Sequence, residues 1–256
     1  MAANVLSFRF CDVQVLFSDC ALCRLLVWWC QGVRLVVRVG GSVVASPFNP
    51  ELMNRYVDLL LSLRRGGHVV VAVVGGGSLS RELIRTAKAM SLGESDQDEV
   101  AISVSRLLAQ LFVLKLGRGG AGVVPTSVEA AAELVGGGRV VVMGGLKPGM
   151  TTDAVAAMLA DCIKADLLVK ATDQDGIYDR DPRKFPDARL LGSLRFDDLG
   201  KLFEADRHRA GIHQVLDPEA VRLLQKRRIK TVVVNGSEPE NVMRAVRGER
   251  VGTLIS

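Results

Sequence analysis

The fold of this chain is decided by residues 69–78, which read VVVAVVGGGS. Six consecutive apolar residues, most of them β-branched, predict a strand that is buried on both faces, as in a parallel sheet covered by helices. Three glycines, residues 75–77, end this strand, and a pattern of helical spacing follows over 78–90. A strand, a glycine turn and a helix in this order form the first part of a βαβ unit.

Strands and helices alternate in the same way from Val33 onwards. The expected strands cover 33–39, 69–74, 123–125, 140–143, 166–171 and 231–234, and the expected helices cover 50–65, 78–90, 98–114, 127–134, 153–162, 218–227 and 239–246. Residues 172–182 are expected to form a polar loop. This alternation favours the α/β class, with βαβ units around a mainly parallel sheet.

The composition is that of a globular protein with a sizeable core. The 256 residues are 48% hydrophobic and 24% charged, as in ordinary folded domains. The net charge of +5 is spread along the chain, which suits anionic ligands such as nucleotides and is too diffuse to predict nucleic acid binding. We expect a cytoplasmic protein with no nucleic acid and no membrane partner.

Residues 1–32 form an atypical N-terminal extension. They hold both tryptophans and four of the five cysteines, Cys11, Cys20, Cys23 and Cys30. The apolar stretches are shorter than the ~18 uninterrupted residues of a membrane span, and the pattern of a secretory signal peptide is missing. Cys20 and Cys23 lack a second pair that would complete a metal site. We interpret residues 1–31 as either a misassigned start or a dispensable appendage.

Glycine clusters end three of the expected strands, at residues 40–41, 75–77 and 144–145. The carboxyl ends of the strands in an open parallel sheet form the ligand crevice. Glycine lets the backbone approach a ligand closely, and the helix that follows presents free N–H groups to phosphate. One such cluster could be an ordinary turn, whereas three at one edge predict a site for several phosphate groups.

Other phosphate and metal motifs are absent or out of context. The sequence has no G-x-x-x-x-G-K-[ST], which excludes a P-loop enzyme. Residues 117–122 match G-x-G-x-x-G but follow an expected helix and lead into an expected strand, so they are not a dinucleotide fingerprint. Asp173 to Gly176 does not fit an EF-hand loop. His68, His208 and His213 show no metal-ligand spacing, and no metal site is predicted.

Several motifs in a fixed order resemble the amino acid kinase family. They are RVGGS at 38–42, VGGGS at 74–78, GGLKPGMTTD at 144–153, ADLLV at 165–169 and ATDQDGIYDRDP at 171–182. The resemblance extends over residues 33–256. Within the family, the sequence is most similar to the archaeal type of UMP kinase, because of the PGMTT segment and of AGIHQVLDP at 210–218.

The resemblance implies a fold, an activity and an assembly. The fold would be a three-layer α/β/α sandwich, with an acceptor-binding part over 33–150 and an ATP-binding part over 151–256. The activity would be transfer of the γ-phosphate of ATP to UMP, giving UDP and ADP in pyrimidine nucleotide biosynthesis, with Mg²⁺ bound together with ATP. The assembly would be a homohexamer.

The resemblance also assigns roles to individual residues. Arg38 and Asp153 would be catalytic. ATP would be bound by Gly41, Ser42, Gly77, Arg81, Thr172, Asp173, Tyr178 and Asp181. UMP would be bound by Gly76, Asp98, Leu146, Lys147, Pro148, Gly149, Met150, Thr151 and Thr152, with Asp98 accepting a hydrogen bond from the ribose.

Two departures from the family pattern leave alternatives open. Arg38 stands where the first strand usually carries lysine, and arginine offers phosphate a forked, permanently charged group instead of a point charge. A second family lysine is missing from 211–216, which disfavours an acetylglutamate kinase. The alternatives are another phosphotransferase of the superfamily, with a carbamate, acetylglutamate or isopentenyl phosphate acceptor, and a non-catalytic nucleotide-binding regulator.

Overall fold

The computed structural model describes residues 32–199 and 216–256. The interpretation of residues 1–31 as a misassigned start or an appendage therefore lies outside the described residues. Residues Val33–Ser256 form one compact unit, and the description below concerns this unit.

A mainly parallel sheet is the centre of the unit, as predicted. In the described part of the chain it has seven strands in the order β3-β2-β1-β4-β8-β9-β7. All neighbouring strands are parallel except β8 and β9, which are antiparallel. The strands are β1 (Arg34–Val39), β2 (Val69–Val74), β3 (Val141–Met143), β4 (Leu167–Thr172), β7 (Ser193–Leu194), β8 (Thr231–Asn235) and β9 (Thr253–Ile255). A separate antiparallel pair joins β5 (Ile177–Tyr178) to β6 (Leu190–Leu191).

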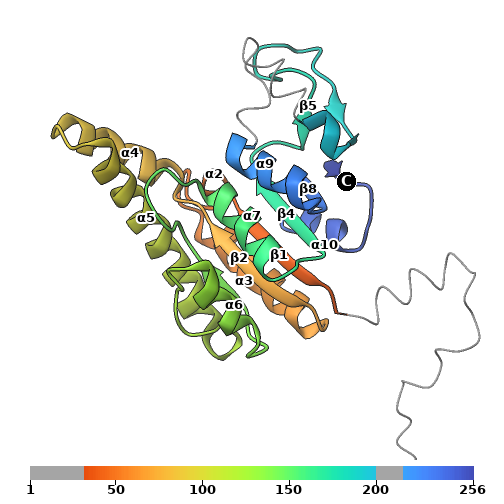
Figure 1. The fold of residues 1–256 in the computed structure, drawn as a ribbon, viewed down its shortest axis with the longest axis horizontal. Helices are drawn as coiled ribbons and strands as arrows, with labels where there is room; N and C mark the ends of the chain where they lie inside the picture. The colour runs from red at the N-terminus through yellow and green to blue at the C-terminus, as the bar shows by residue number, and fades with distance from the viewer. Residues whose placement is uncertain (1–31, 200–215) are drawn as a thin grey trace, which may run out of the picture. The chain divides into compact units, whose positions relative to one another are not determined.

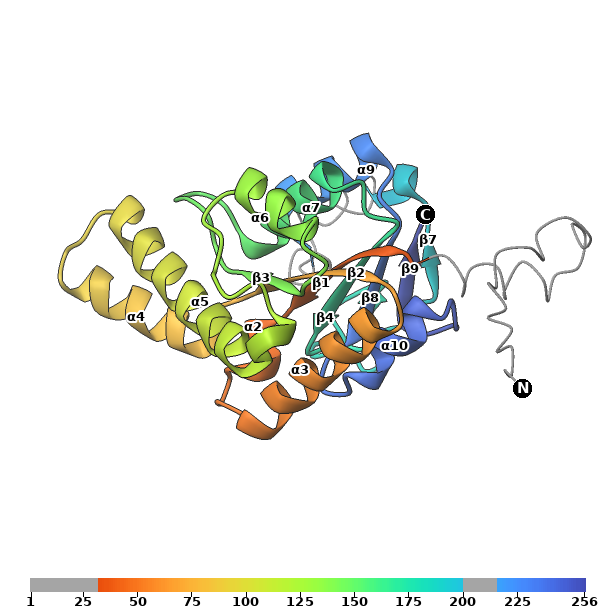
Figure 2. The ribbon, with the colours of Figure 1, turned by 90° about the horizontal axis from the view of Figure 1, so that it is seen from below.

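Helices cover both faces of the sheet, which confirms the three-layer α/β/α arrangement (Figures 1 and 2). One face packs against α2 (Gly41–Val44), α3 (Pro50–Arg65), α5 (Glu94–Leu116) and α10 (Glu240–Val246). The other face packs against α6 (Val128–Val135), α7 (Thr152–Cys162) and α9 (Pro218–Arg227). A further helix, α4 (Gly77–Ala89), packs against α5.

The central strands feed both cores, as expected for strands that are buried on both faces. In β1, Leu35 and Val37 point into the core under α3 and α5, and Val36 points into the core under α7. Each fully buried Val or Leu side chain contributes about 1.5–3 kcal/mol to stability. The burial of these side chains on both faces holds the sheet between its two helical layers.

Residues Glu94–Gly119, which include α5, are long and apolar enough to cross a membrane by length and composition. However, 44% of the most apolar window is buried inside the protein. Leu108, Phe112 and Val113 belong to the core cluster. This segment is therefore a core helix of the unit that also has an exposed face.

The predicted helices and strands are confirmed with small shifts, and one strand is wrong. Residues 123–125 are irregular, because Gly122 turns the chain with a φ of +83° and Pro125 has no N–H to donate to a ladder. The long helix begins at Glu94, four residues before its predicted start. Residues 117–122 begin with a short 3₁₀ turn after α5, so they lack the strand–turn–helix context of a dinucleotide fingerprint.

Candidate active site

The glycine loops after β1 and β2 touch each other at the carboxyl edge of the sheet. A Cβ atom added to Gly41 would lie 2.1 Å from the backbone nitrogen of Gly77, and one added to Gly77 would lie 2.4 Å from the carbonyl oxygen of Gly41. Gly77 also has a φ of +65°, a conformation that disfavours any side chain. Only glycine allows these two loops to meet, and their meeting brings Gly41, Gly76 and Gly77 to one space above the strand ends.

The third glycine cluster lies at the same edge of the sheet, because it follows β3 and β3 runs parallel to β2. Gly144 packs against α5, where an added Cβ would be 2.7 Å from the backbone nitrogen of Arg106. The loop that follows returns to the strand ends only at Thr152 and Asp153. The three clusters therefore share one edge of the sheet, as expected. Two of them meet directly and line the cavity described below, whereas the third reaches it only through the residues that begin α7.

A cavity of about 360 Å³ opens at this edge of the sheet. It is lined by Arg38, Gly41, Ser42, Gly75, Gly76, Gly77, Arg81, Thr152, Asp153, Lys170, Thr172, Asp173, Gln174 and Arg183. The lining contains four cationic and two anionic side chains, and the first turns of α4 and α7 reach it through Gly77 and Thr152. Excess positive charge, glycine backbone and two helix N-termini make the cavity suited to phosphate groups.

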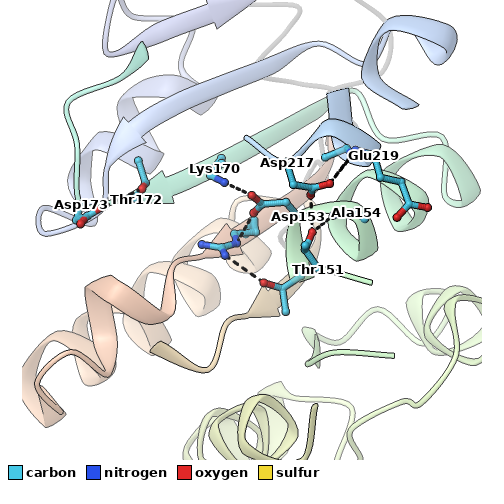
Figure 3. Close-up of polar contacts among 11 residues, drawn as sticks. Thr151, Asp153, Ala154, Lys170, Thr172, Asp173, Asp217 and Glu219 are labelled. Atoms are coloured by element: carbon cyan, nitrogen blue, oxygen red, sulfur yellow. Dashed lines mark hydrogen bonds and ion pairs between the residues drawn. The ribbon is translucent and has the colours of Figure 1, made fainter. Parts of the chain in front are cut away.

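A buried group of three charges forms the floor of the cavity. Arg38 on β1 and Lys170 on β4 are neighbours in the sheet register. Asp153, in the first turn of α7, forms an ion pair with each of them. Nε of Arg38 lies 2.7 Å from Oδ1 of Asp153, and Nζ of Lys170 donates a hydrogen bond to Oδ2. Figure 3 shows Lys170 and Asp153 pointing toward each other from their strand and helix.

Burial shifts the pKa of both Lys170 and Asp153. Desolvation lowers the pKa of Lys170 to about 8, with the charge of Asp153 opposing this effect and the charge of Arg38 adding to it. Desolvation alone would raise the pKa of Asp153, but the charges of Arg38 and Lys170 outweigh it and hold the pKa below its usual value. Two cations thus share one carboxylate, and the group keeps a net positive charge that faces the cavity.

Hydroxyl groups at the start of α7 tie the floor to the neighbouring elements. An Nη atom of Arg38 donates to Oγ1 of Thr152 at 3.1 Å. Thr151 caps α7 by accepting from the backbone nitrogen of Ala154 at 3.1 Å, and its hydroxyl donates to Asp217. Asp217 in turn caps α9, accepting from the backbone nitrogens of Glu219 and Ala220. The N-termini of α7 and α9 are therefore fixed to each other beside the charged floor.

The loop over 144–152 is held in place by α5. Arg106 donates from Nε to the carbonyl oxygen of Gly145 at 3.0 Å and from Nη to that of Leu146 at 2.9 Å. Asp98 accepts from the backbone nitrogen of Gly149 at 2.6 Å. This contact occupies one oxygen of the carboxylate that the sequence assigned to the acceptor ribose, and the other oxygen has no such contact among the described hydrogen bonds.

The loop after β4 lies on the opposite side of the cavity. Thr172 and Asp173 line it, and Arg183 pairs with Asp173 at 3.0 Å. Asp181 is buried and accepts from the backbone nitrogen of Arg183 at 3.0 Å. Tyr178 donates to Asp175 at 3.3 Å. Asp181 and Tyr178 thus shape this loop from outside the cavity.

The structure brings together part of the predicted site. Ten predicted residues line the cavity: Arg38, Gly41, Ser42, Gly76, Gly77, Arg81, Thr152, Asp153, Thr172 and Asp173. The other nine are not among its lining: Asp98, Leu146, Lys147, Pro148, Gly149, Met150, Thr151, Tyr178 and Asp181. Of these nine, the residues over 146–151 lie on the loop that α5 holds.

Sequence reasoning missed Lys170, Asp217, Arg106 and Arg183. Lys170 had a detectable signal, because it interrupts an apolar strand that is expected to be buried, and lysine is almost never fully buried unless it is paired. Asp217 before Pro218 is readable as a helix cap, but its contact with Thr151 depends on the fold. Arg106 and Arg183 carried no signal that distinguishes them from surface arginines.

The described residues offer little for a metal ion by themselves. No group of three or more His, Cys, Asp or Glu side chains within residues 32–199 and 216–256 is arranged to hold one. Both oxygens of Asp153 are engaged by cations. A divalent cation at this site would have to arrive with its own oxygen ligands, as it does when it is bound to the phosphates of a nucleotide.

Comparison with known proteins gives a consistent family. The chain is 39% identical over 223 residues to the uridylate kinase of Methanothermobacter thermautotrophicus, covering 87% of this chain and 99% of the relative. It is 40% identical to the uridylate kinase of Halorubrum lacusprofundi, covering 87% and 93%. The crystal structure of uridylate kinase from Archaeoglobus fulgidus superimposes with a TM-score of 0.78 at 36% identity, covering 87% of this chain and 99% of that one.

A more distant structure shares the fold. The UMP kinase of Bacillus anthracis superimposes with a TM-score of 0.76 at 22% identity, covering 88% of this chain and 96% of that one. The model of the amino acid kinase family matches residues 33–235. On this match, and on the archaeal relatives above, the chain belongs to the amino acid kinase family.

Proposed function

We propose that this chain is a UMP kinase, which transfers the γ-phosphate of ATP to UMP and releases UDP and ADP, a step of pyrimidine nucleotide biosynthesis. The observation that carries the proposal is the cavity at the strand ends, where two interlocked glycine loops meet the buried group of Arg38, Asp153 and Lys170. Relatives that are named uridylate kinase, with more than a third of their residues identical, support UMP as the acceptor.

The acceptor sets the demands on the site. A phosphate oxygen of UMP is already an anion near neutral pH, so no general base is needed. What the reaction needs is alignment of two anions that repel each other and neutralisation of charge on the phosphoryl group in transfer. The cavity offers the amides of Gly76 and Gly77 and the cations Arg38 and Lys170 for this purpose.

Arg38 and Lys170 act as a fixed electrostatic pair. Asp153 holds both side chains in place before substrate binds, so the protein does not reorganise during the reaction. Preorganised charge of this kind is usually the largest contribution to catalysis. Lys170 supplies the point charge that the sequence pattern expected on the first strand, where Arg38 supplies a fork instead. With Lys170 in the cavity, the absence of lysine at position 38 does not argue against phosphotransfer.

The two substrates approach from opposite sides of the cavity. We assign ATP to Gly41, Ser42, Gly77, Arg81, Thr172 and Asp173 in the lining of the cavity, and to Tyr178 and Asp181 in the loop after β4. We assign UMP to the side formed by Gly76, Asp98 and the loop over 146–152. We assign acceptor binding to the part over 33–150 and binding of the base and ribose of ATP to the part over 151–256. Gly41, Ser42, Gly77 and Arg81 would reach the ATP phosphates from the first part.

Mg²⁺ would enter with ATP. When bound, it would neutralise part of the charge on the phosphate groups. Asp153, a carboxylate in the lining of the cavity, already serves two cations, so phosphate oxygens and water would be the main ligands of the ion. The homohexamer and the cytoplasmic location that the family resemblance implies belong to the same proposal.

The test is release of ADP from Mg·ATP with UMP, CMP, carbamate, acetylglutamate and isopentenyl phosphate offered in turn to the full chain. We expect turnover with UMP that exceeds turnover with each other acceptor by at least about 100-fold, as for a site that must pair the polar groups of its substrate. Preference for another acceptor would identify a different phosphotransferase of the family. Nucleotide binding without turnover for any acceptor would identify a regulator.

A further inference from the structure

Arg183 is a cationic residue of the cavity that belongs neither to the glycine loops nor to the buried floor. It lines the cavity together with Asp173, from the loop after β4. An Nη atom of Arg183 donates to Oδ2 of Asp173 at 3.0 Å, and the two side chains are 62% and 43% exposed. An ion pair this exposed contributes little to stability, so its members can exchange partners at a small cost in free energy.

The backbone of Arg183 is held firmly, in contrast to its side chain. Its N–H donates to Oδ1 of Asp181 at 3.0 Å, and Asp181 is buried. The carbonyl oxygen of the same aspartate accepts from the backbone nitrogens of Lys184 and Phe185 at 3.1 and 2.9 Å. The long side chain of Arg183 therefore starts from a fixed turn at the wall of the cavity.

Asp173 is the less mobile member of the pair. Its Oδ1 accepts from the hydroxyl of Thr172 at 3.1 Å, and Thr172 is the last residue of β4. Figure 3 shows Thr172 and Asp173 next to each other at this end of the strand. Rotation about the side-chain bonds of Arg183 is enough to release Oδ2 of Asp173, and no change in the backbone is needed.

The two side chains suit two adjacent parts of one nucleotide. A carboxylate accepts hydrogen bonds from ribose hydroxyls, and a guanidinium donates paired hydrogen bonds to phosphate oxygens. In a nucleotide the ribose is joined through its 5′-oxygen to the α-phosphate. A cation within 3.0 Å of a carboxylate that binds the ribose is therefore close to the first phosphates of the chain, whereas Arg38 and Lys170 face the phosphoryl group in transfer.

We propose that Arg183 is a nucleotide-binding residue that exchanges partners, leaving Asp173 to the ribose of the donor nucleotide and binding the α- and β-phosphates instead. The proposal rests on the proposed function, because it takes ATP as the nucleotide on this side of the cavity. The exchange is favourable for Arg183, since a diphosphate carries more negative charge than one carboxylate. It adds a fourth cation to the three that Arg38, Arg81 and Lys170 provide.

The test is the affinity of the full chain for adenosine, ADP and the β,γ-imido analogue of ATP in excess Mg²⁺, measured by calorimetry with adenosine titrated in competition against ADP. Arg183→Gln should weaken binding of ADP and of the analogue about tenfold each, as for the loss of one charge-assisted hydrogen bond. The same variant should tighten binding of adenosine about 2- to 5-fold, because Asp173 then has no competing cation.

Two other patterns of affinity would overturn the proposal. Weaker binding of all three ligands would show that Arg183 only supports the fold of its loop. A loss confined to the ATP analogue would place the guanidinium at the γ-phosphate and not at the first two phosphates. Because the side chain is exposed, the melting temperature of Arg183→Gln should equal that of the unmodified chain.

Arg180→Gln is the matched control. Arg180 lies on the same loop, is 46% exposed and pairs with Asp187 at 3.3 Å, but it is not among the residues that line the cavity. Its replacement should leave the affinities for all three ligands unchanged. A loss of ADP affinity as large as that of Arg183→Gln would attribute the effect to the general loss of one positive charge and refute the proposal.

A double-mutant cycle isolates the exchange between the two residues. In the Asp173→Ala background, Arg183→Gln should no longer tighten the binding of adenosine, because no carboxylate remains to be released. It should still weaken the binding of ADP about tenfold, since the contact with phosphate does not require Asp173. A gain for adenosine that persists in this background would contradict the exchange.

Kinetics connects the exchange to the reaction. Arg183→Gln should raise the KM for ATP about tenfold and leave the KM for UMP unchanged, because α5 and not the loop after β4 holds the acceptor loop. A rise in the KM for UMP alone would contradict the assignment. The calorimetry requires no turnover, so a chain in which Arg183→Gln shows the expected affinities but which does not phosphorylate UMP would refute the proposed acceptor and leave the exchange intact.

Discussion

The two ends of α7 carry the same set of charges in different surroundings. At the N-terminal end, Asp153 pairs with Arg38 and Lys170, whose side chains are 16% and 6% exposed. Near the C-terminal end, Asp161 pairs with Lys164 and Arg227, whose side chains are 72% and 49% exposed. Each aspartate serves one lysine and one arginine.

This comparison indicates that the surroundings of a charged group, and not its residue types, make it functional. Around Asp161, water screens the charges, and such surface pairs contribute little. Around Asp153, burial shifts the pKa of both the carboxylate and Lys170, and the two cations are held beside the glycine loops that line the cavity. The buried group also lies at the end of the helix where the dipole favours a carboxylate, whereas Asp161 lies near the opposite end.

The largest effect is expected on the unfolding free energy of variants of the two aspartates. Asp153→Asn leaves two buried cations without a counter-charge, and removal of one partner from such a group costs about 3–5 kcal/mol of unfolding free energy. Asp161→Asn should cost less than about 1 kcal/mol, because its partners are solvated. Urea unfolding of both variants measures the difference, and equal losses would show that the burial of Asp153 has no energetic consequence.

The next largest effect is a difference in kcat between variants of Lys170 and Lys164. Lys170→Met removes one preorganised charge from the cavity and should lower kcat about 10²- to 10³-fold. The melting temperature should stay near that of the unmodified chain, since the pair of Arg38 and Asp153 remains. Lys164→Met is the matched control and should leave kcat unchanged. A Lys170→Met enzyme with full turnover at saturating ATP and UMP would remove Lys170 from the catalytic group.

A smaller effect follows from the pKa of Lys170, which is about 8 in the free protein. Because the protonated lysine attracts phosphate, kcat/KM for ATP should fall above pH 8, by up to about tenfold per pH unit for a single ionisation. Bound phosphate stabilises the ammonium form, so the fall in kcat should occur at higher pH. A pH profile of kcat/KM without a descending limb between pH 7.5 and about 9.5 would contradict this assignment.

Protein stability should move in the opposite direction over this range. The pKa of Lys170 is about 8 in the folded chain against an ordinary value of 10.5. Between these values the unfolded chain binds more protons, so this group makes the unfolding free energy rise with pH. Loss of activity above pH 8 with retained melting temperature would therefore come from deprotonation and not from unfolding.

The sequence predicted the layers of the fold because its signals were local. An apolar strand such as 69–74 that ends in glycines predicts its own place in a parallel sheet. The short strands β5, β6, β7 and β9 were not predicted, since two or three residues carry no readable period. In the same way Gly41 and Gly77 were identified, but their direct contact across two loops follows only from the fold.

Part of the candidate site could also be predicted from the sequence, and part could not. Lys170 could have been found as the one charge inside a buried strand, because such a residue needs a partner. Its partner Asp153 was identified from the family pattern. The contact of Asp217 with Thr151 joins two helix caps that lie 66 residues apart in the sequence, and no local pattern reports a contact of that kind.

The smallest expected effect concerns a third carboxylate, that of Asp98, whose described hydrogen bond is to a backbone amide. It accepts from the amide of Gly149 and pairs with no cation among the described ion pairs, so its loss should cost little stability. Asp98→Ala should raise the KM for UMP about tenfold, as expected for the loss of one hydrogen bond to an anionic acceptor. The KM for ATP should stay the same. Glu129→Ala, an exposed carboxylate in the first turn of α6, is the control.

The 2′-deoxy form of UMP distinguishes two roles of Asp98. If the free oxygen of this carboxylate accepts from the 2′-hydroxyl of the ribose, the effect of Asp98→Ala should shrink toward the part that comes from the Gly149 contact. If Asp98 acts only by holding Gly149, the effect should be equally large for both acceptors. A change in the KM for ATP would contradict both roles, because α5 holds the loop on the acceptor side of the charged floor, opposite the loop after β4.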